Sequence, residues 1–238
     1  MRYLHFIFCT AVMAIALTFS SCHKERLNIS GSTSIPELEG RMLYLRIYQN
    51  SELQELDSAA ITHGKFQFTA PAKDSVIMAF LFLGDESLMP MVVNRTEPLT
   101  ITISENERRV EGSALNDTLY AFIKRKNVID QQMAELPRRE SQMILDGIDH
   151  DEILQQLSQE AAILSARENE MVMRFIKDNM DNILAPGVFM IVTSNLPYPI
   201  LNPQIEELVT LGSPTFLNDA YVSEYLEMAR ENMEKINE

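Results

Sequence analysis

A cysteine near the N-terminus, Cys22, is the residue whose setting most clearly indicates a chemical modification. Upstream of it, Arg2 supplies a positive charge, and Leu4 to Phe19 form an apolar run that is followed by two serines. The run is shorter than the roughly 20 residues of a spanning helix, and this order of parts is typical of a bacterial signal peptide with a lipoprotein-type cleavage site. We therefore expect residues 1–21 to be a lipoprotein signal peptide and Cys22 to be the lipidated first residue of the mature chain.

The mature chain is expected to be strongly acidic. The full sequence has a net charge of −14, and without residues 1–21, which hold only Arg2, the remaining 19 basic and 34 acidic residues give −15. Nucleic acid and anionic lipid headgroups repel such a chain, so we expect no nucleic-acid partner and a membrane contact made through the acyl chains at Cys22. Because His23 rather than Asp follows the cysteine, we favour a cell-envelope location at the outer membrane, facing the periplasm or the cell surface.

Metal chemistry has one candidate, a group of four carboxylates between two expected helices. The group lacks the Asp-x-Asp-x-Asp-Gly spacing of a calcium loop, and helix capping explains such residues better. The three histidines after Cys22 show no paired ligand spacing. We therefore expect no metal and no cofactor. The four carboxylates are Asp146, Asp149, Asp151 and Glu152.

No arrangement of residues indicates catalysis. No two of the eight glycines lie closer than nine positions, which excludes the usual phosphate-cradling loops, and no Gly-x-Ser-x-Gly is present. Cys9 lies in the segment expected to be removed, so the mature chain would have no disulfide and no Cys-x-x-Cys pair. The sequence predicts a protein that is not an enzyme, with no catalytic residue to name.

Three tripeptides consist of Asp, then Ser or Thr, then an apolar residue, and their hydroxyls are at Ser58, Ser75 and Thr118. Some envelope proteins of Gram-negative bacteria are O-glycosylated at sequences that resemble these. The alternative is that Asp-Ser and Asp-Thr pairs begin turns and helices. These three residues are therefore candidate O-glycosylation sites.

Residues 22–112 are predicted to form a β-sandwich or open barrel of seven or eight antiparallel strands, because apolar residues alternate with polar ones along most of this region. A short turn at Thr62 to Lys65 predicts that Glu55 to Ile61 pairs with Lys65 to Ala70. The run Ser75 to Leu83 is apolar on both faces, so it needs a cover on each side. The favoured cover is the helical half of the chain, and an exposed partner-binding face is the alternative.

Leu88, Met89 and Met91 are the candidate contact surface for a partner. They are apolar residues in the segment Gly84 to Met91, which we expect to be a loop next to a turn.

Residues 113–238 are predicted to form an α-helical region, so the fold class is α+β. Ser113 is a plausible N-cap, and Pro137 is expected to end the first helix. Apolar residues recur every three or four positions in the first two helices, and the only interruptions are Lys126 in one and Glu168 in the other. This region carries a net charge of −11, which indicates solvated helix faces in preference to a site for a cation or a basic partner.

Four strings resemble a β-rich domain of unknown function found at the N-terminus of thioredoxin-like envelope lipoproteins of the thiol-disulfide reductase type. They are Leu56 to Ser58, Gly64 to Phe68, Leu99 to Ile103 and Val110 to Asn116. In such proteins a helical segment and then a thioredoxin-like domain with Cys-x-x-Cys follow. This sequence ends at Glu238 and has no cysteine after Cys22. The redox activity that the resemblance implies therefore has no residues here to carry it.

These observations favour a lipid-anchored envelope protein with a non-enzymatic binding or accessory role, whose partner could be a thioredoxin-like oxidoreductase of the envelope. The alternative is a module that binds a small molecule or a glycan, for which tyrosines would have to serve because the chain has no tryptophan. The oligomeric state is left open.

Overall fold

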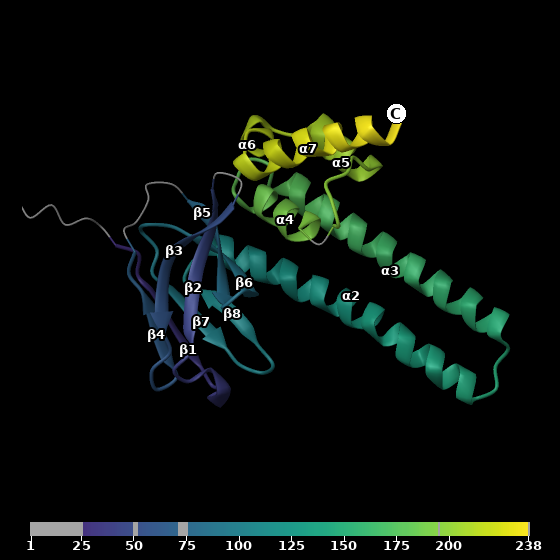
Figure 1. Ribbon diagram of the computed structural model, residues 1–238, viewed down its shortest axis with the longest axis horizontal. Coiled ribbons are helices and arrows are strands. Elements are labelled where there is room, and N and C mark those ends of the chain that lie inside the picture. The colour runs from purple at the N-terminus through teal and green to yellow at the C-terminus, as the bar shows by residue number, and fades with distance from the viewer. Residues whose placement is uncertain (1–25, 50–51, 71–75, 195, 238) are drawn as a thin grey trace, which may run out of the picture.

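The computed structural model describes residues 26–49, 52–70, 76–194 and 196–237, and it shows an α+β fold in which strands precede helices (Figure 1). The strands are β1 (Ile29–Thr33), β2 (Met42–Gln49), β3 (Glu52–Ala60), β4 (Lys65–Phe68), β5 (Ile77–Leu83), β6 (Glu86–Val93), β7 (Leu99–Ile103) and β8 (Arg108–Glu111). The helices are the short 3-10 turn η1 (Pro36–Leu38), α2 (Ala114–Leu145), α3 (His150–Asp178), α4 (Leu184–Thr193), α5 (Pro203–Leu211), α6 (Pro214–Leu217) and α7 (Ala220–Asn237).

The strands form two four-stranded sheets that pack face to face as a sandwich, with orders β4-β1-β7-β8 and β3-β2-β5-β6. Within the described residues neither sheet closes on itself, so the architecture is a sandwich and not a barrel. All pairs are antiparallel except β1 with β7, which run parallel and correct the expectation of a fully antiparallel region. The inner faces make the first core, which includes Leu45, Leu81 and Ile101.

The turn at Thr62 to Lys65 is confirmed, but the pairing predicted for its flanking strands is wrong. The backbone N–H groups of Thr62 and Lys65 donate to each other's carbonyl oxygens, and His63 and Gly64 both have positive φ. Beyond the turn the chain changes sheet, because β3 pairs with β2 while β4 pairs with β1. In the β1–β4 pair, Phe66 lies opposite Gly31, and its ring covers the glycine. Any side chain at position 31 would collide with that ring.

Strand β5 has a core on each side, as its doubly apolar sequence predicts. Ala79 and Leu81 face the interior of the sandwich. Met78, Phe80 and Phe82 face a second core formed with the helices. The helical half therefore covers the outer face of the second sheet, and the prediction that it does so is confirmed.

Helices α2 and α3 form a long antiparallel hairpin that projects from the rest of the molecule, whereas α4 to α7 lie against the sandwich and the inner end of α3 (Figure 1). Ser113 caps α2 and Asp149 caps α3, both through side-chain oxygens that accept backbone N–H groups. At 32 and 29 residues, the two helices measure about 48 and 43 Å. None of the described helices combines the length and the apolar character needed to cross a membrane.

Pro137 does not end the first helix, which continues to Leu145. A proline inside a helix removes one backbone hydrogen bond and is usually disruptive. Here Met133 and Leu136 pack against Leu157 and Ala161 of α3. These contacts hold the turn before Pro137 against α3, and after the proline Arg139 pairs with Glu160 of α3.

Candidate functional site

The first turn of α2 is fixed to the sandwich by one buried side chain, Asn116. Its Oδ1 accepts the backbone N–H of Val92 at 2.9 Å, and its Nδ2 donates to the Val92 carbonyl oxygen at 2.8 Å. Val92 belongs to β6, the edge strand of the second sheet, so the amide occupies the place of a neighbouring strand's backbone. Ser113 supports this arrangement, because its Oγ accepts both the backbone N–H and the Nδ2 of Asn116 at 3.2 Å.

One turn further along α2, Tyr120 makes a second bond to the same edge. Its hydroxyl donates to the Pro90 carbonyl oxygen at 2.9 Å. Burial raises the pKa of the Tyr120 phenol well above its ordinary value, and the nearby positive charge of Arg108 opposes that rise. The phenol therefore remains a neutral hydrogen-bond donor at any physiological pH. Asn116 and Tyr120 thus hold the start of α2, which we call the root of the hairpin, to β6 at two points.

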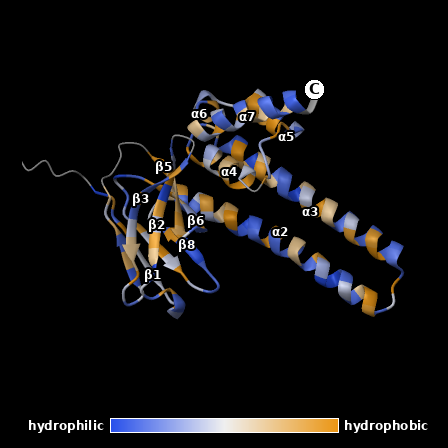
Figure 2. Cartoon of the chain, in the orientation of Figure 1, coloured by the Kyte–Doolittle hydropathy of each residue, from blue (hydrophilic) through white to orange (hydrophobic). Residues whose placement is uncertain are grey.

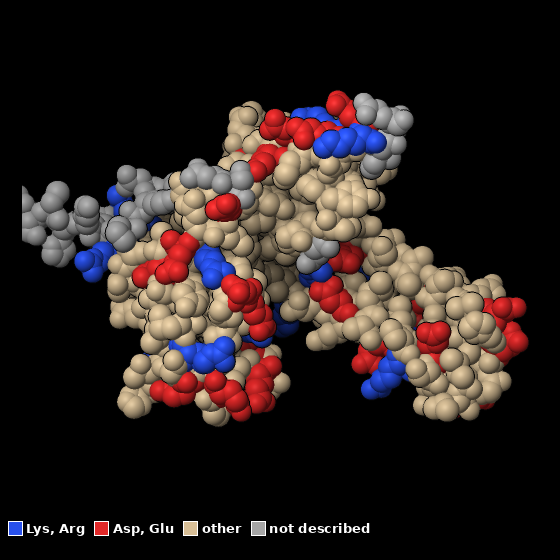
Figure 3. All heavy atoms as spheres, in the orientation of Figure 1, with Lys and Arg blue, Asp and Glu red and all other residues tan. Residues whose placement is uncertain are grey.

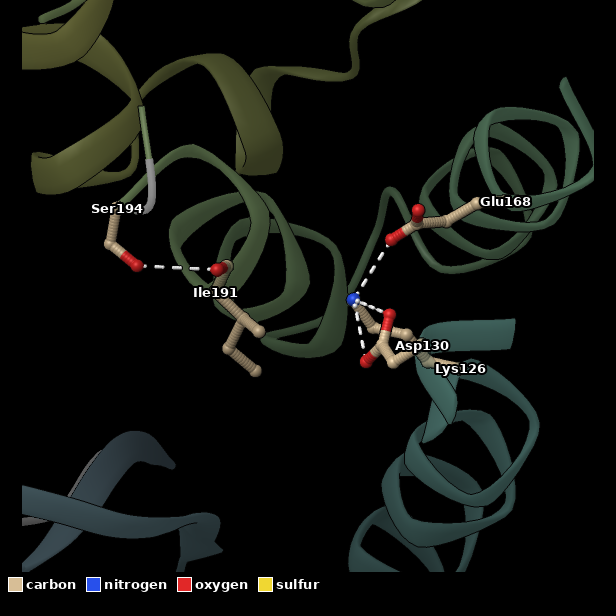
Figure 4. A network of polar contacts seen from close by, with 5 residues as sticks. All are labelled: Lys126, Asp130, Glu168, Ile191 and Ser194. Carbon is tan, nitrogen blue, oxygen red and sulfur yellow. Dashed lines mark hydrogen bonds and ion pairs between the residues drawn. The ribbon is translucent and has the colours of Figure 1, made fainter. Parts of the chain in front are cut away.

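Lys126 joins the two long helices just outside this root. Its Nζ lies 2.8 Å from both Asp130 on α2 and Glu168 on α3, and Figure 4 shows the ammonium group between the two carboxylates. Burial lowers the pKa of Lys126, but the bonds to Asp130 and Glu168 outweigh that effect and leave the pKa above its ordinary value. The two polar interruptions of the apolar series are thus partners of each other.

Beyond this clamp, α2 and α3 pack mainly on one another and form what we call the arm, residues 127–167. Its seam consists of Ile129, Leu136 and Leu164 with half-buried neighbours, and Arg139 pairs with Glu160 across the helices. The outer end, which we call the tip, comprises residues 140–160.

The tip combines exposed apolar side chains with a high density of negative charge. Ile144 and Leu145 are 55% and 80% exposed, and the hydrophobic colour at the end of α2 is visible in Figure 2. Residues 140–160 include six Asp and Glu residues and no Lys or Arg. Figure 3 shows carboxylates at this outer end. Such a surface suits a partner with an apolar pocket that is rimmed by basic residues.

Two hollows flank the root of the arm. One, of about 400 Å³, lies between α2 and α3 and is lined by three arginines above an aromatic floor. The other, of about 890 Å³, lies between α2 and the β7–β8 hairpin. Its lining mixes both signs of charge, with Arg108, Arg109 and Lys124 beside Glu107 and Asp117.

The expected contact surface at Leu88, Met89 and Met91 is corrected by the structure. These residues lie in strand β6 and not in a loop, and Met89 and Met91 are buried in the sandwich core. The alternation of the strand explains the difference, because its inward positions need apolar residues. Leu88 is half-buried, and its carbonyl oxygen accepts a bond from Arg108 at 3.0 Å.

Of the candidate modification sites, two lie in the described residues. Ser58 is half-buried on β3, and Asp57 beside it accepts the backbone N–H groups of Ser58 and Thr69. Thr118 is exposed on α2, where its hydroxyl donates to the Ala114 carbonyl oxygen at 2.9 Å. Ser75 and Cys22 lie outside the described residues. Modification at these positions stays a prediction.

Comparison with protein families gives one match, to the part of the chain that forms the sandwich. Residues 27–119 match the family model described as "Domain of unknown function (DUF4369)". The match is confined to this stretch, which is less than half of the chain. The DUF4369 match therefore covers the whole sandwich and the first turns of α2, including Asn116. No curated protein and no solved structure matches the chain.

One member of the acidic group between the two helices, Asp149, caps α3. Asp149 accepts the backbone N–H groups of Asp151 and Glu152, and Asp146 accepts a bond from Gln142. Within the described part of the chain, no group of three or more metal-binding side chains comes together. Sequence patterns missed the residues that shape the root and tip, Asn116, Arg125, Arg167, Ile144 and Leu145. In the sequence, Ile144 and Leu145 form an apolar pair beside an acidic turn, and Asn116 is the last residue of the string Val110 to Asn116.

Proposed function

We propose that this chain is a lipid-anchored envelope protein that uses the tip of its arm to dock a protein partner, without catalysing a reaction itself. The arm is the observation that carries the proposal. Two long helices are fixed to a sandwich at one end and present an exposed apolar pair at the other.

The position of the expected anchor supports this role. Cys22 precedes the first described residue, Arg26, by four residues, which span about 14 Å at most when fully extended. Leu27 is buried in the sandwich, and the tip lies at the opposite end of the molecule's long axis (Figure 1). A lipid at Cys22 would therefore hold the sandwich close to the membrane and leave the end of α2 about 44 Å from Asn116, which fixes the helix to the sandwich.

The tip also defines the chemistry of the partner. Leu145 and Ile144 would enter an apolar pocket, while the surrounding carboxylates would meet lysines or arginines at its rim. The partner class that we propose is a thioredoxin-like oxidoreductase of the envelope, as the resemblance of the sandwich domain implies.

The test is in-cell crosslinking of the full chain from its native host, followed by mass spectrometry of the attached proteins. In the variant Ile144→Asp/Leu145→Asp, we expect loss of the thioredoxin-like partner with no loss of fold, because both side chains are already exposed. Capture should also weaken as salt is raised, since the tip and its partner attract each other through opposite charges.

The matched control is Val128→Asp/Ile163→Asp, which changes two other apolar residues of the arm, each 52% exposed, away from the tip. This control should retain the partner. Equal loss in both variants, or full retention in the tip variant, would contradict docking through the tip. Capture of a tip-dependent partner from another class would overturn the thioredoxin assignment alone.

A further inference from the structure

The hollow between α2 and α3 at the root has an aromatic floor. Phe122 of α2 is buried and Phe175 of α3 is half-buried, with ring centroids 4.5 Å apart, and Met171 lies beside them. Its volume of about 400 Å³ is within the range of small-molecule sites. A flat or flexible apolar group could lie on this floor.

Three arginines surround the floor. Arg167 and Arg174 lie two turns apart on α3, about 10 Å along its axis, and Arg125 projects from α2. The contacts of Lys126 with Glu168 and of Phe122 with Phe175 set the antiparallel register of the two helices. This register places Arg125 opposite the stretch between the two α3 arginines.

Two of the three guanidinium groups, those of Arg125 and Arg167, have N–H donors that are not used within the part of the protein that the structure describes. Arg174 pairs with Glu170 at 2.8 Å. Arg125 bonds its Nε to the Ala121 carbonyl oxygen at 3.1 Å, which leaves both Nη groups. Among the described residues, Arg167 has no hydrogen-bond or ion-pair partner for its side chain.

The net charge of the site favours an anion with a single negative charge. Glu170 and Asp178 also line the hollow, so three arginines face two carboxylates and the site has a net charge of about +1 in a chain of −14. A monoanion matches that charge better than a phosphate dianion does. A carboxylate also fits the planar fork of arginine through two parallel bonds.

We propose that this hollow binds an amphipathic carboxylate, with the carboxylate between Arg125 and Arg167 and its apolar body on Phe122, Met171 and Phe175. The site lies at the root of the arm, so it does not depend on docking through the tip. Loss of one of the two functions would leave the other intact.

The probes are 2-naphthoate and decanoate, titrated into the full mature chain by calorimetry, with 2-naphthamide as the uncharged counterpart. We expect saturable binding of at least one carboxylate and about 10- to 100-fold weaker binding of the amide, because the charge-assisted bonds are lost. The variant Arg125→Gln/Arg167→Gln should weaken carboxylate binding by a similar factor.

The control is Arg138→Gln/Arg230→Gln, which removes two exposed arginines away from the hollow and changes the net charge by the same amount. It should leave carboxylate affinity unchanged. Equal weakening in both double variants would show a net-charge effect and overturn the site. So would the absence of saturable binding of either carboxylate up to about 10 mM, a limit that corresponds to negligible affinity.

Discussion

Asn116 does with one side chain what an additional strand would do with its backbone. Its amide bonds both the N–H and the carbonyl oxygen of Val92, which is fully buried together with Asn116. A buried backbone group that loses its partner costs about 1–3 kcal/mol, so the side chain has a large influence on stability relative to its size.

We expect Asn116→Ala to lower the free energy of unfolding by about 2–4 kcal/mol, because two buried backbone groups would lose their partner. Urea unfolding followed by circular dichroism measures the change. Asn127→Ala, at an exposed position of the same helix, is the control and should stay within about 0.5 kcal/mol of the unmodified protein. A loss at Asn116 no larger than at Asn127 would show that water or a shift of α2 replaces the amide.

At the residue scale, sequence patterns predicted helix N-caps better than they predicted contacts between residues far apart in the chain. Ser113 and Asp149 cap the expected helices because local chemistry decides a cap. The role of Asn116 depends on β6, 24 residues earlier in the chain, and no local pattern contains that information. For the same reason Met89 and Met91 were predicted to lie on the surface although the structure buries them.

Among the elements, the arm depends on few contacts between its two helices. Its seam is narrow, and the Lys126 clamp adds a charged connection where an apolar residue would otherwise lie. The interruptions at Lys126 and Glu168 were visible in the sequence. Their pairing was not, because it requires the register of the two helices.

We expect the clamp to give the arm a measurable dependence on pH. The pKa of Lys126 is higher in the folded state than in the unfolded chain, so its contribution to stability is complete below the unfolded pKa of about 10.4 and is lost as pH rises through the folded pKa. The stability difference between the unmodified protein and Lys126→Met should therefore decrease from pH 9 upward. Urea titrations at a series of pH values measure that difference. Ionisation of tyrosines affects both proteins equally and therefore does not contribute to it.

Lys124→Met serves as the control for loss of one positive charge, because Lys124 is exposed on the same helix. If both lysine variants showed the same pH dependence, the clamp would not be its source.

Strand pairing was the least predictable part of the fold. The two runs beside the Thr62 to Lys65 turn are ordinary hairpin sequences, and a local rule pairs them. In the structure β3 pairs with β2 and β4 pairs with β1. Pairing with β1 places Phe66 and Phe68 of β4 in the core between the two sheets. The doubly apolar β5 was easier to interpret, since a strand that is apolar on both faces requires two covers wherever it lies.

At the scale of the whole molecule, attachment at Cys22 decides which way the arm points. We expect Cys22→Ala to lose all label from a fatty acid supplied to the growing cells, because the thiol is the proposed acylation site. Cys9→Ala, within the apolar run, should keep the label. Gel detection of the labelled protein measures both, and a labelled Cys22→Ala protein would contradict the proposed anchor.

The packing of the helices on β5 and β6 also limits how this chain can be divided. A fragment that ended at residue 112 would leave Phe80 and Phe82 in water and the backbone of Val92 unpaired at a sheet edge. Exposed apolar strands with open edges recruit other copies of themselves, so such a fragment would tend to aggregate. The helices thus prevent self-association of the sandwich by covering the outer face of its second sheet. A protein that contained the sandwich without these helices would need another element to cover that face.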